Sequence, residues 1–215
     1  MPDSAEALLA ALPASLRDLA AAGEVRRYRR GTLLIEEGDR GSTLFIVLSG
    51  RLRAFSRHPV NEREITYGIY GAGEYVGEMG LDGEPRSASV EVLDPCTCAR
   101  IDRPTLEAHI ARHPAFALEL LAKVIRRARA ATMSLKQIAL NDVYGRIKQL
   151  LDDSAQPRGD GTRVIAQRFT HLELSQRLGC GREMVSRVMK DLERGGYVAR
   201  DGEQLVLLRP LPARW

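Results

Sequence analysis

Arg182, Glu183 and Arg187 are the residues whose types and spacing indicate chemistry most directly, and they stand at the start of a predicted helix. A guanidinium can bond to both acceptors of guanine, and a carboxylate can accept from the cytosine amino group. A helix that presents these groups at its N-terminal end is suited to read base edges in a DNA major groove. The pattern therefore favours sequence-specific DNA binding over the alternative, a helical hairpin whose charged face is simply solvated.

The elements that must position these side chains are two short helices joined by a glycine turn. Thr170 and Glu173 have the spacing of a capping box, which starts the first helix. Gly179 and Gly181 flank the turn, where unusual backbone dihedrals are easiest for glycine. The expected apolar positions of the two helices are Leu172, Leu174, Leu178, Val185, Val188, Met189 and Leu192.

The segments that follow predict a wing beside these helices. Residues 194–200 and 204–208 have the composition of two short strands, and Asp201 and Gly202 form the turn between them. Residues 142–215 contain 13 Lys or Arg against 10 Asp or Glu, so most of the formal net charge of +4 lies here. Together these features predict a winged helix-turn-helix.

Composition limits the class of protein. A chain of 215 residues is long enough for one large or two small domains. Its cysteines, Cys96, Cys98 and Cys180, are odd in number and follow no secretory signal, which favours a reducing compartment without disulfides. No window approaches the roughly 20 apolar residues of a membrane span. We therefore expect a cytoplasmic protein with no membrane partner.

The first half of the chain has a sequence pattern typical of β-strands. After a short helical lead-in over residues 1–22, glycine-containing turns separate short apolar runs, which predicts a β-sandwich or barrel. The expected strands are residues 32–35, 44–48, 51–55, 64–69, 88–92 and 98–101.

A long helix is expected between the two ends of the chain. It starts at Pro114, runs to about Asn141, and carries a heptad seam that favours a parallel homodimer over a helix packed only on its own β-domain. A further helix follows over residues 142–154, with a hinge near Asn141 and Asp142. The fold class is α+β, with a β-roll domain over residues 1–113, a dimerisation helix over 114–141 and a winged helix-turn-helix over 142–215. The seam residues are Leu118, Leu121, Ile125, Ala128, Thr132, Leu135 and Ala139.

This order of parts resembles the CRP/FNR family of bacterial transcription regulators, which includes the cyclic-AMP receptor protein. The resemblance covers nearly the whole chain and is carried by the glycine-punctuated β-segment, residues 77–88, the long helix, residues 142–147 and residues 179–187. It implies a homodimer that binds palindromic double-stranded DNA and contacts RNA polymerase, and it implies that the chain is not an enzyme. Family members touch polymerase near the position of residues 156–161.

The segment from Gly77 to Ser87 has the chemistry of a phosphate site. Arg86 offers a forked cation, and Ser87 adds a hydroxyl donor. Backbone amides near Gly77 can approach closely because no side chain intervenes, and Glu78 can accept from a ribose hydroxyl. By resemblance, the effector-binding residues are Gly77, Glu78, Met79, Arg86, Ser87, Arg127 and Thr132.

Two departures from the cyclic-AMP receptor bear on the identity of the effector. Ala131 stands where the cyclic-AMP receptor has a threonine that contacts the adenine, and the loop between Glu78 and Arg86 is shorter than in that protein. The expected effector is a cyclic nucleotide, with cyclic AMP favoured. Cyclic di-GMP and an effector-independent regulator, in which the same residues form only structural ion pairs, are the alternatives.

Other cofactors and activities fit the residues poorly. No cysteine precedes Cys96, and two cysteines cannot fill a four-thiolate site, so neither an iron–sulfur cluster nor a structural metal is expected. No histidine spacing suits haem, and His58 alone could not build a metal-oxygenase centre. The remaining alternative, a sensor subunit of a partner enzyme, is disfavoured by the C-terminal winged helix.

The resemblance also distributes roles at the DNA site. It assigns base readout to Arg182, Glu183 and Arg187, with Ser186 shared with the oxygen-sensing branch of the family, and it implies half-sites close to TGTGA. The residues at phosphate-contacting positions are Thr170, His171 and Gly181.

Overall fold

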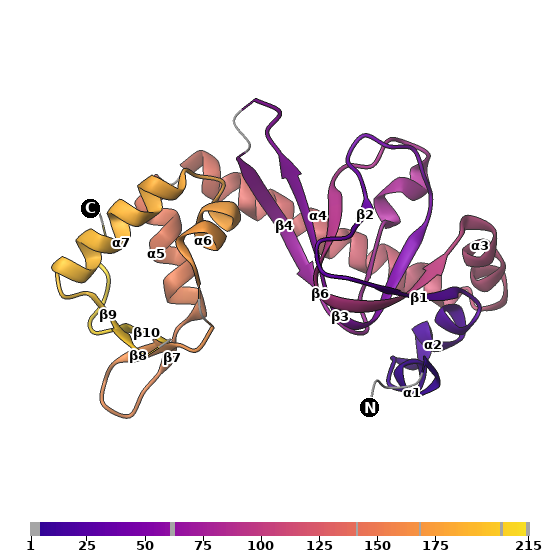
Figure 1. Cartoon of the computed structure of the whole chain (residues 1–215), viewed down its shortest axis with the longest axis horizontal. Coiled ribbons are helices and arrows are strands. Elements are labelled where there is room, and N and C mark those ends of the chain that lie inside the picture. Colours follow the sequence, from indigo (N-terminus) through magenta and orange to yellow (C-terminus); the bar gives the residue numbers. More distant parts are fainter. Residues whose placement is uncertain (1–4, 61–62, 141, 168, 203, 214–215) are drawn as a thin grey trace. The chain divides into compact units, whose positions relative to one another are not determined.

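The computed structural model describes the chain except residues 1–4, 61–62, 141, 168, 203 and 214–215, and the side chains of residues 136–140 are also not described. The chain divides into two compact units (Figure 1). The first comprises residues 1–56 and 66–127, and the second comprises residues 57–65 and 128–215.

The first unit is built on a sheet whose two long strands each have several partners. Strands β6 and β3 lie side by side in the order β1-β6-β3-β4, while β2 pairs with β6 and β5 pairs with β3. All pairings whose register is described are antiparallel. The strands are β1 (Glu24–Tyr28), β2 (Leu33–Ile35), β3 (Leu44–Arg57), β4 (Glu64–Tyr70), β5 (Tyr75–Val76) and β6 (Ser89–Ile101).

The prediction of two separate strands in place of β3, and of two more in place of β6, was wrong, because each is one continuous strand. A turn was expected at Ser49 and Gly50, yet β3 continues through them because its pairing with β6 continues on both sides, with Gly50 at a left-handed φ of 81°. The ladder between β3 and β6 shifts register on both sides of Ser49, so the irregularity is absorbed without a chain reversal. Strands β1 and β5 were not predicted as separate elements.

Helices cover this sheet at one end (Figure 1). Helix α2 (Ala14–Ala21) contacts β1 and β6 and follows the short α1 (Ala5–Ala10), and α3 (Arg103–Arg112) contacts α2. Asp102 starts α3 by accepting a hydrogen bond from the Thr105 amide, while proline stands in the first turn. The shared core of this end contains Leu19, Leu44, Ile46, Ile101, Leu106 and Phe116.

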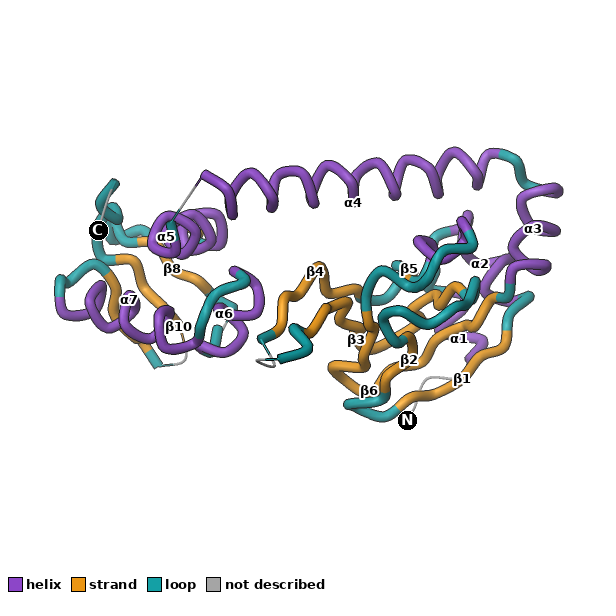
Figure 2. The backbone as a smooth tube through the Cα atoms, turned by 90° about the horizontal axis from the view of Figure 1, so that it is seen from above, coloured by secondary structure: helices purple, strands orange, loops and turns teal. Residues whose placement is uncertain are grey.

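Helix α4 (Ala115–Leu140) is continuous, as the sequence predicted (Figure 2). Phe116 and Leu120 on one face pack into the core of the first unit. The heptad seam lies on a different face, and its described members from Leu118 to Leu135 are all exposed in the single chain. The last seam residue, Ala139, lies outside the residues whose side chains are described. This exposed apolar row of α4 is therefore not covered by the described residues of the single chain.

The second unit is a helical bundle with a small sheet. Asp142 starts its first helix by accepting from the Gly145 amide, whereas Asn141, the other residue of the expected hinge, lies outside the described residues. The sheet has the order β7-β8-β10-β9, so it has two strands more than the predicted wing, and β7 falls in the segment expected to be a loop. The elements are α5 (Val143–Ser154), β7 (Gln156–Pro157), β8 (Arg163–Ile165), α6 (His171–Leu178), α7 (Arg182–Arg194), β9 (Val198–Asp201) and β10 (Gln204–Leu207).

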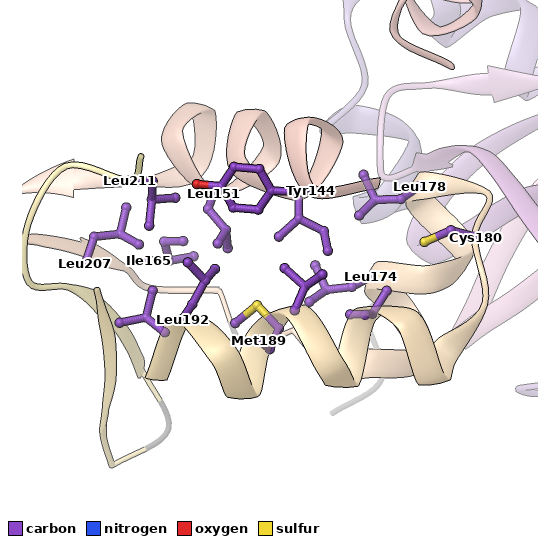
Figure 3. Packing of buried hydrophobic residues seen from close by; sticks show 14 residues of the cluster. Tyr144, Leu151, Ile165, Leu174, Leu178, Cys180, Met189, Leu192, Leu207 and Leu211 are labelled. Atoms are coloured by element: carbon purple, nitrogen blue, oxygen red, sulfur yellow. The ribbon is translucent and has the colours of Figure 1, made fainter. Parts of the chain in front are cut away.

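The core of this unit joins three helices to the sheet (Figure 3). Leu151 of α5 packs among residues of α6, α7 and β10, including Leu174, Leu192 and Leu207, and each is at most 2% exposed. All four apolar residues predicted for α7 are buried. Leu172 was expected in the core of α6 but is half exposed, because Leu174 and Leu178 occupy the side of the helix that faces α7.

None of the helices in the described part of the chain combines the length and the apolar character needed to cross a membrane.

Candidate functional site

The first candidate site is the pair of helices α6 and α7, whose local geometry follows from their caps. The Thr170 hydroxyl accepts from the Glu173 amide at 3.1 Å, and the Glu173 carboxylate accepts from the Thr170 amide at 2.7 Å, so the predicted capping box is present. Gly179 ends α6 with a left-handed φ of 61°. Gly181 does not need this freedom, because its φ is −70° in the extended N-cap position of α7.

The exposed face of α7 brings the predicted base-reading residues together. One hollow at the surface is lined by Arg182, Glu183, Ser186 and Arg187, together with Gly181. Gly181 caps α7 without a side-chain hydrogen bond, so the amides of the first turn face outward at the positive end of the helix dipole. The hollow therefore offers forked cations, a carboxylate acceptor and backbone donors within one surface.

Lys190 is a member of this surface that the sequence analysis missed. It lines the same hollow and is exposed. Its position three residues after Arg187 and four after Ser186 places it on their face of the helix. Lys190 could have been predicted from this spacing, because a cation one helical turn beyond the base-reading residues is placed to contact a phosphate.

Thr170 and His171 stand at the start of α6, as predicted. Because the Thr170 oxygen accepts from Glu173, the hydroxyl proton is directed elsewhere and can serve as a donor. Burial lowers the pKa of His171, and the nearby Arg200 lowers it further. His171 therefore favours the neutral form near neutral pH, and a phosphate close to it would favour the charged form.

The second candidate site surrounds Arg86 in the first unit. Arg86 is 7% exposed, and its guanidinium donates to the carbonyl oxygens of Gly77 at 2.7 Å and Thr43 at 2.9 Å. Burial lowers the pKa of Arg86, against the raising effect of the Glu78 carboxylate. These two bonds hold the planar fork in a fixed orientation, and an arginine has five N–H donors in all.

Glycines make room for this guanidinium. A Cβ atom at Gly80 would lie 2.7 Å from Arg86 Nη1 and 2.5 Å from the Gly41 oxygen, so no other residue fits without movement. Gly77 has a left-handed φ of 96°, and a Cβ there would lie 2.5 Å from the Thr43 oxygen. The backbone is thus closely packed around the cation, as an anion-binding cradle requires.

Glu78 lies in the same cradle and is only 5% exposed. It forms an ion pair with Arg127 of α4, and Arg127 also donates to the Tyr75 carbonyl at 2.6 Å. The Arg127 guanidinium stacks on the ring of Tyr70, with 4.6 Å from its central carbon to the ring centroid. Burial raises the pKa of Tyr75 to about 12 and also raises that of Tyr70, so both rings are neutral neighbours of this ion pair.

The remaining predicted effector residues are placed differently. Met79 and Ser87 are exposed beside the cradle, which leaves the Ser87 hydroxyl accessible to a ligand. Thr132 belongs to the second unit, where its hydroxyl donates to the Ala128 carbonyl of its own helix at 3.0 Å. Five of the seven predicted residues therefore adjoin one another around Gly77 and Arg86, Arg127 joins them through Glu78, and Thr132 is described only within its own unit.

The described residues contain no group of three or more histidine, cysteine or carboxylate side chains placed to hold a metal ion. The functional groups of both sites are cations, carboxylates, hydroxyls and backbone amides, which bind nucleotides and nucleic acids through ionic and hydrogen-bonding contacts.

Comparison with known proteins matches both units. Residues 25–113 match the cyclic nucleotide-binding domain family, and residues 145–211 match the Crp-like helix-turn-helix domain family. The cAMP-activated global transcriptional regulator CRP of Haemophilus influenzae is 30% identical over 190 residues, which cover 85% of this chain and 83% of that protein. The CRP-like cAMP-activated global transcriptional regulator of Mycobacterium tuberculosis is 28% identical over 184 residues, which cover 84% and 82%.

A solved structure shares the whole architecture. The c-di-GMP responsive global regulator CLP of Xanthomonas campestris is 27% identical, with a TM-score of 0.78 over 91% of this chain and 98% of that one. The fold expected from the sequence, an N-terminal β-domain, a long helix and a C-terminal helix-turn-helix, is thereby confirmed.

Proposed function

Since the chain belongs to the CRP/FNR family of transcription regulators, we propose that it is a homodimer whose binding to palindromic operator DNA is gated by cyclic AMP. The observation that carries the effector assignment is the buried pair Arg86 and Glu78 in one glycine cradle. The hydrogen bonds of the buried Arg86 guanidinium go to uncharged carbonyl oxygens, which leaves its charge available to a ligand phosphate. The buried Glu78 carboxylate beside it suits a hydroxyl donor.

Each functional group of a cyclic nucleotide has a partner in this cradle. Arg86 and the Ser87 hydroxyl would hold the phosphate, and Glu78 would accept from the ribose 2′-hydroxyl. Because the carbonyls of Gly77 and Thr43 already orient Arg86, little rearrangement of the fork is needed on binding. Arg127 and Thr132, both on α4, would report the bound ligand to the long helix.

The choice of nucleotide is tested by isothermal titration calorimetry of the purified protein with cyclic AMP and, separately, with cyclic di-GMP. We expect saturable one-to-one binding of cyclic AMP per chain. Tighter binding of cyclic di-GMP would replace this effector by the one named for the Xanthomonas regulator. Binding of neither nucleotide would make the cradle a structural ion-pair cluster and the protein an effector-independent regulator.

At the DNA site, α7 would enter the major groove with Arg182, Glu183 and Arg187 at base edges and Ser186 between them. Thr170, His171, Gly181 and Lys190 would face phosphates, and half-sites close to TGTGA would fit the readout residues. In a symmetric dimer the two copies of α7 would reach grooves about 34 Å apart, one turn of B-DNA. A binding-site selection from random duplexes tests this, and recovery of a non-palindromic or unrelated sequence would contradict it.

The homodimer is supported by the exposed apolar row on α4. Leu118, Leu121, Ile125 and Leu135 are each between 44% and 69% exposed in the single chain, at heptad spacing. A second copy of the same helix would cover this row, and the single polar seam residue, Thr132, would lie at the contact. In the cytoplasm such a dimer on DNA would present its surfaces, including residues 156–161, to RNA polymerase.

Replacing a seam residue by a charge tests the dimer directly. We expect Ile125→Glu to shift the protein to a monomer in sedimentation velocity, because two carboxylates would be buried and two apolar contacts worth about 1.5–3 kcal/mol each would be lost. The control is Glu119→Lys, a charge change at an exposed residue of α4 off the seam, which should leave the dimer intact. A wild-type monomer at micromolar concentration would contradict the proposal.

A further inference from the structure

Two buried thiols in the first unit have no role in either candidate site. Cys96 and Cys98 lie two residues apart on β6, are 3% and 0% exposed, and place their sulfur atoms 3.2 Å apart. Alternate residues of a strand share a face, which explains why both side chains enter the same core. All three cysteines of the chain are free, and the third, Cys180, lies in the second unit.

From this pair of sulfur atoms we infer a reversible modification site, at which hydrogen peroxide converts the two thiols of Cys96 and Cys98 into an intrachain disulfide. In the first step one thiolate attacks peroxide, forming a sulfenic acid and releasing hydroxide, which takes up the thiol proton as water. In the second step the other thiol displaces water from the sulfenic acid and closes the S–S bond. Overall, two thiols and one peroxide give one disulfide and two water molecules.

The geometry suits a disulfide that forms with difficulty and is easily reduced. Residues two apart on an extended strand have Cα atoms about 6.6 Å apart, near the upper end of the range that disulfides tolerate. The sulfur atoms must approach by about 1 Å more to reach bonding distance. A bond under such strain is readily reduced, which is the property of regulatory disulfides rather than structural ones.

The two thiols differ in a way that assigns their roles. A hydrogen bond from Cys98 lowers the pKa of the Cys96 thiol, whereas the same contact and burial raise the pKa of the Cys98 thiol. Cys96 also directly follows the exposed Pro95, so it is the group that meets peroxide, and Cys98 is the resolving thiol.

Access to a buried thiol needs local opening, and the strand opposite Cys96 is irregular. The β3–β6 ladder shifts register between Val47 and Ser49 and again between Ser49 and Arg51. Gly50 fits against Cys96 only because it has no side chain, since a Cβ there would lie 2.7 Å from the Cys96 Cα. The neighbouring Pro95 is exposed. Irregular ladder segments open at lower free energy than regular ones, and peroxide is about as small as water.

The disulfide would act on the effector cradle through the backbone. Cys98 pairs with Val47 of β3, and the Val47 amide donates to the Glu74 carbonyl at 2.8 Å. Two residues along β3, Phe45 pairs with Val76, which directly precedes Gly77. Cys96, Cys98, Val47, Phe45 and Val76 share one core cluster. Closing the disulfide would therefore displace the strand from which the cradle begins, so oxidation should weaken effector binding. This consequence rests on the proposed function, whereas the disulfide itself does not.

The test treats reduced wild-type protein with hydrogen peroxide, unfolds it in denaturant so that buried thiols are accessible, alkylates the remaining thiols and maps the peptides by mass spectrometry. We expect the peptide containing Cys96 and Cys98 to lose the mass of two hydrogens and escape alkylation, and dithiothreitol to reverse this. The control is Cys98→Ala, in which Cys96 should gain oxygen and form no intrachain bond. Alkylation of both thiols at peroxide levels that oxidise glutathione completely would overturn the proposal.

Calorimetric titration with cyclic AMP before and after oxidation tests the consequence. We expect the oxidised protein to bind about fivefold or more weakly, with recovery on reduction and no such loss in peroxide-treated Cys98→Ala. Equal affinity of the oxidised and reduced protein would overturn the link to the cradle. If the reduced protein does not bind cyclic AMP at all, the proposed effector is wrong, and the peptide map still decides whether the disulfide forms.

Discussion

In the first unit Arg86 and Glu78 are almost completely buried, whereas Arg182, Glu183 and Arg187 on α7 are exposed. Folding alone fixes the buried pair, because the carbonyls of Gly77 and Thr43 bind the guanidinium of Arg86. For the exposed residues on α7, folding fixes the position of the helix but not the orientation of the side chains, which depends on the bound DNA. A substitution in the buried pair should therefore disturb both folding and effector binding, whereas a substitution on the exposed face of α7 should weaken only DNA binding.

Arg86→Ala should have the largest effect. It removes a buried cation and leaves two carbonyl oxygens without their donor, so both the melting temperature and the affinity for cyclic AMP should fall. Charge-assisted hydrogen bonds are each worth about 1.5–3 kcal/mol, which predicts a loss of binding of about a hundredfold, measured by calorimetry. Arg26→Ala, an exposed arginine paired with Glu24 of the same strand β1, is the control and should change neither quantity. If the folded Arg86→Ala variant bound cyclic AMP with full affinity, Arg86 would not be the residue that binds the ligand phosphate.

Arg187→Ala should have the next largest effect and should leave the melting temperature unchanged, because the side chain is exposed. Loss of a bidentate base contact costs about 1–3 kcal/mol of discrimination, so the preference for a specific over a scrambled duplex should fall by about 5- to 150-fold per half-site in fluorescence anisotropy. Unchanged preference for the operator would show that Arg187 does not read bases.

Lys190→Ala sharpens the contrast within α7 itself. If Lys190 contacts a phosphate, its replacement should weaken binding to specific and non-specific duplexes by the same factor. The slope of log K against log salt should fall by about two, one for each subunit of the dimer. A change confined to the specific operator would instead make Lys190 a base-reading residue.

His109 gives the smallest effect, and it belongs to the buried class. It is 2% exposed, its ring lies 5.0 Å from that of Phe116, and neither nitrogen has a hydrogen-bond partner among the described residues. Burial lowers the pKa of His109, and His113 lowers it further, so the folded protein binds this proton less readily than the unfolded chain. The free energy of unfolding should therefore fall as pH drops through the unfolded pKa of about 6.5.

His109→Phe should reduce that loss between about pH 7 and pH 5, measured by urea unfolding at each pH. The reference is the stability difference between the same two proteins at about pH 8, where this imidazole is neutral in both the folded and the unfolded wild type. An identical pH dependence in the His109 variant and the wild type would show that this histidine is not the group that titrates.

The two regions also differed in how far the sequence predicted them. On α7 the spacing of apolar residues determines which side chains are left outside, so Arg182, Glu183 and Arg187 could be placed together, and Lys190 could have been. Around Arg86 the chemistry of the residues was recognisable, but its contacts were not. The bonds to Gly77 and Thr43 and the ion pair between Glu78 and Arg127 depend on how β3, β5 and α4 pack, which no local pattern encodes.

The strands show the same limit. Gly50 is a turn signal by residue type, yet β3 passes through it because pairing with β6 continues on both sides. The short β1 and β5 exist because the long strands offer them edges, rather than because their own residues demand a strand. Leu172 illustrates the reverse case, in which an apolar residue at the start of a helix is left exposed.

The most direct test of the account measures the affinity of the wild-type protein for a palindromic TGTGA operator by fluorescence anisotropy, with and without saturating cyclic AMP. If ligand binding in the cradle around Arg86 gates the exposed face of α7, the nucleotide should tighten operator binding by about tenfold or more, and Arg86→Ala should abolish the increase. Equal affinity in the presence and absence of the nucleotide would contradict gating.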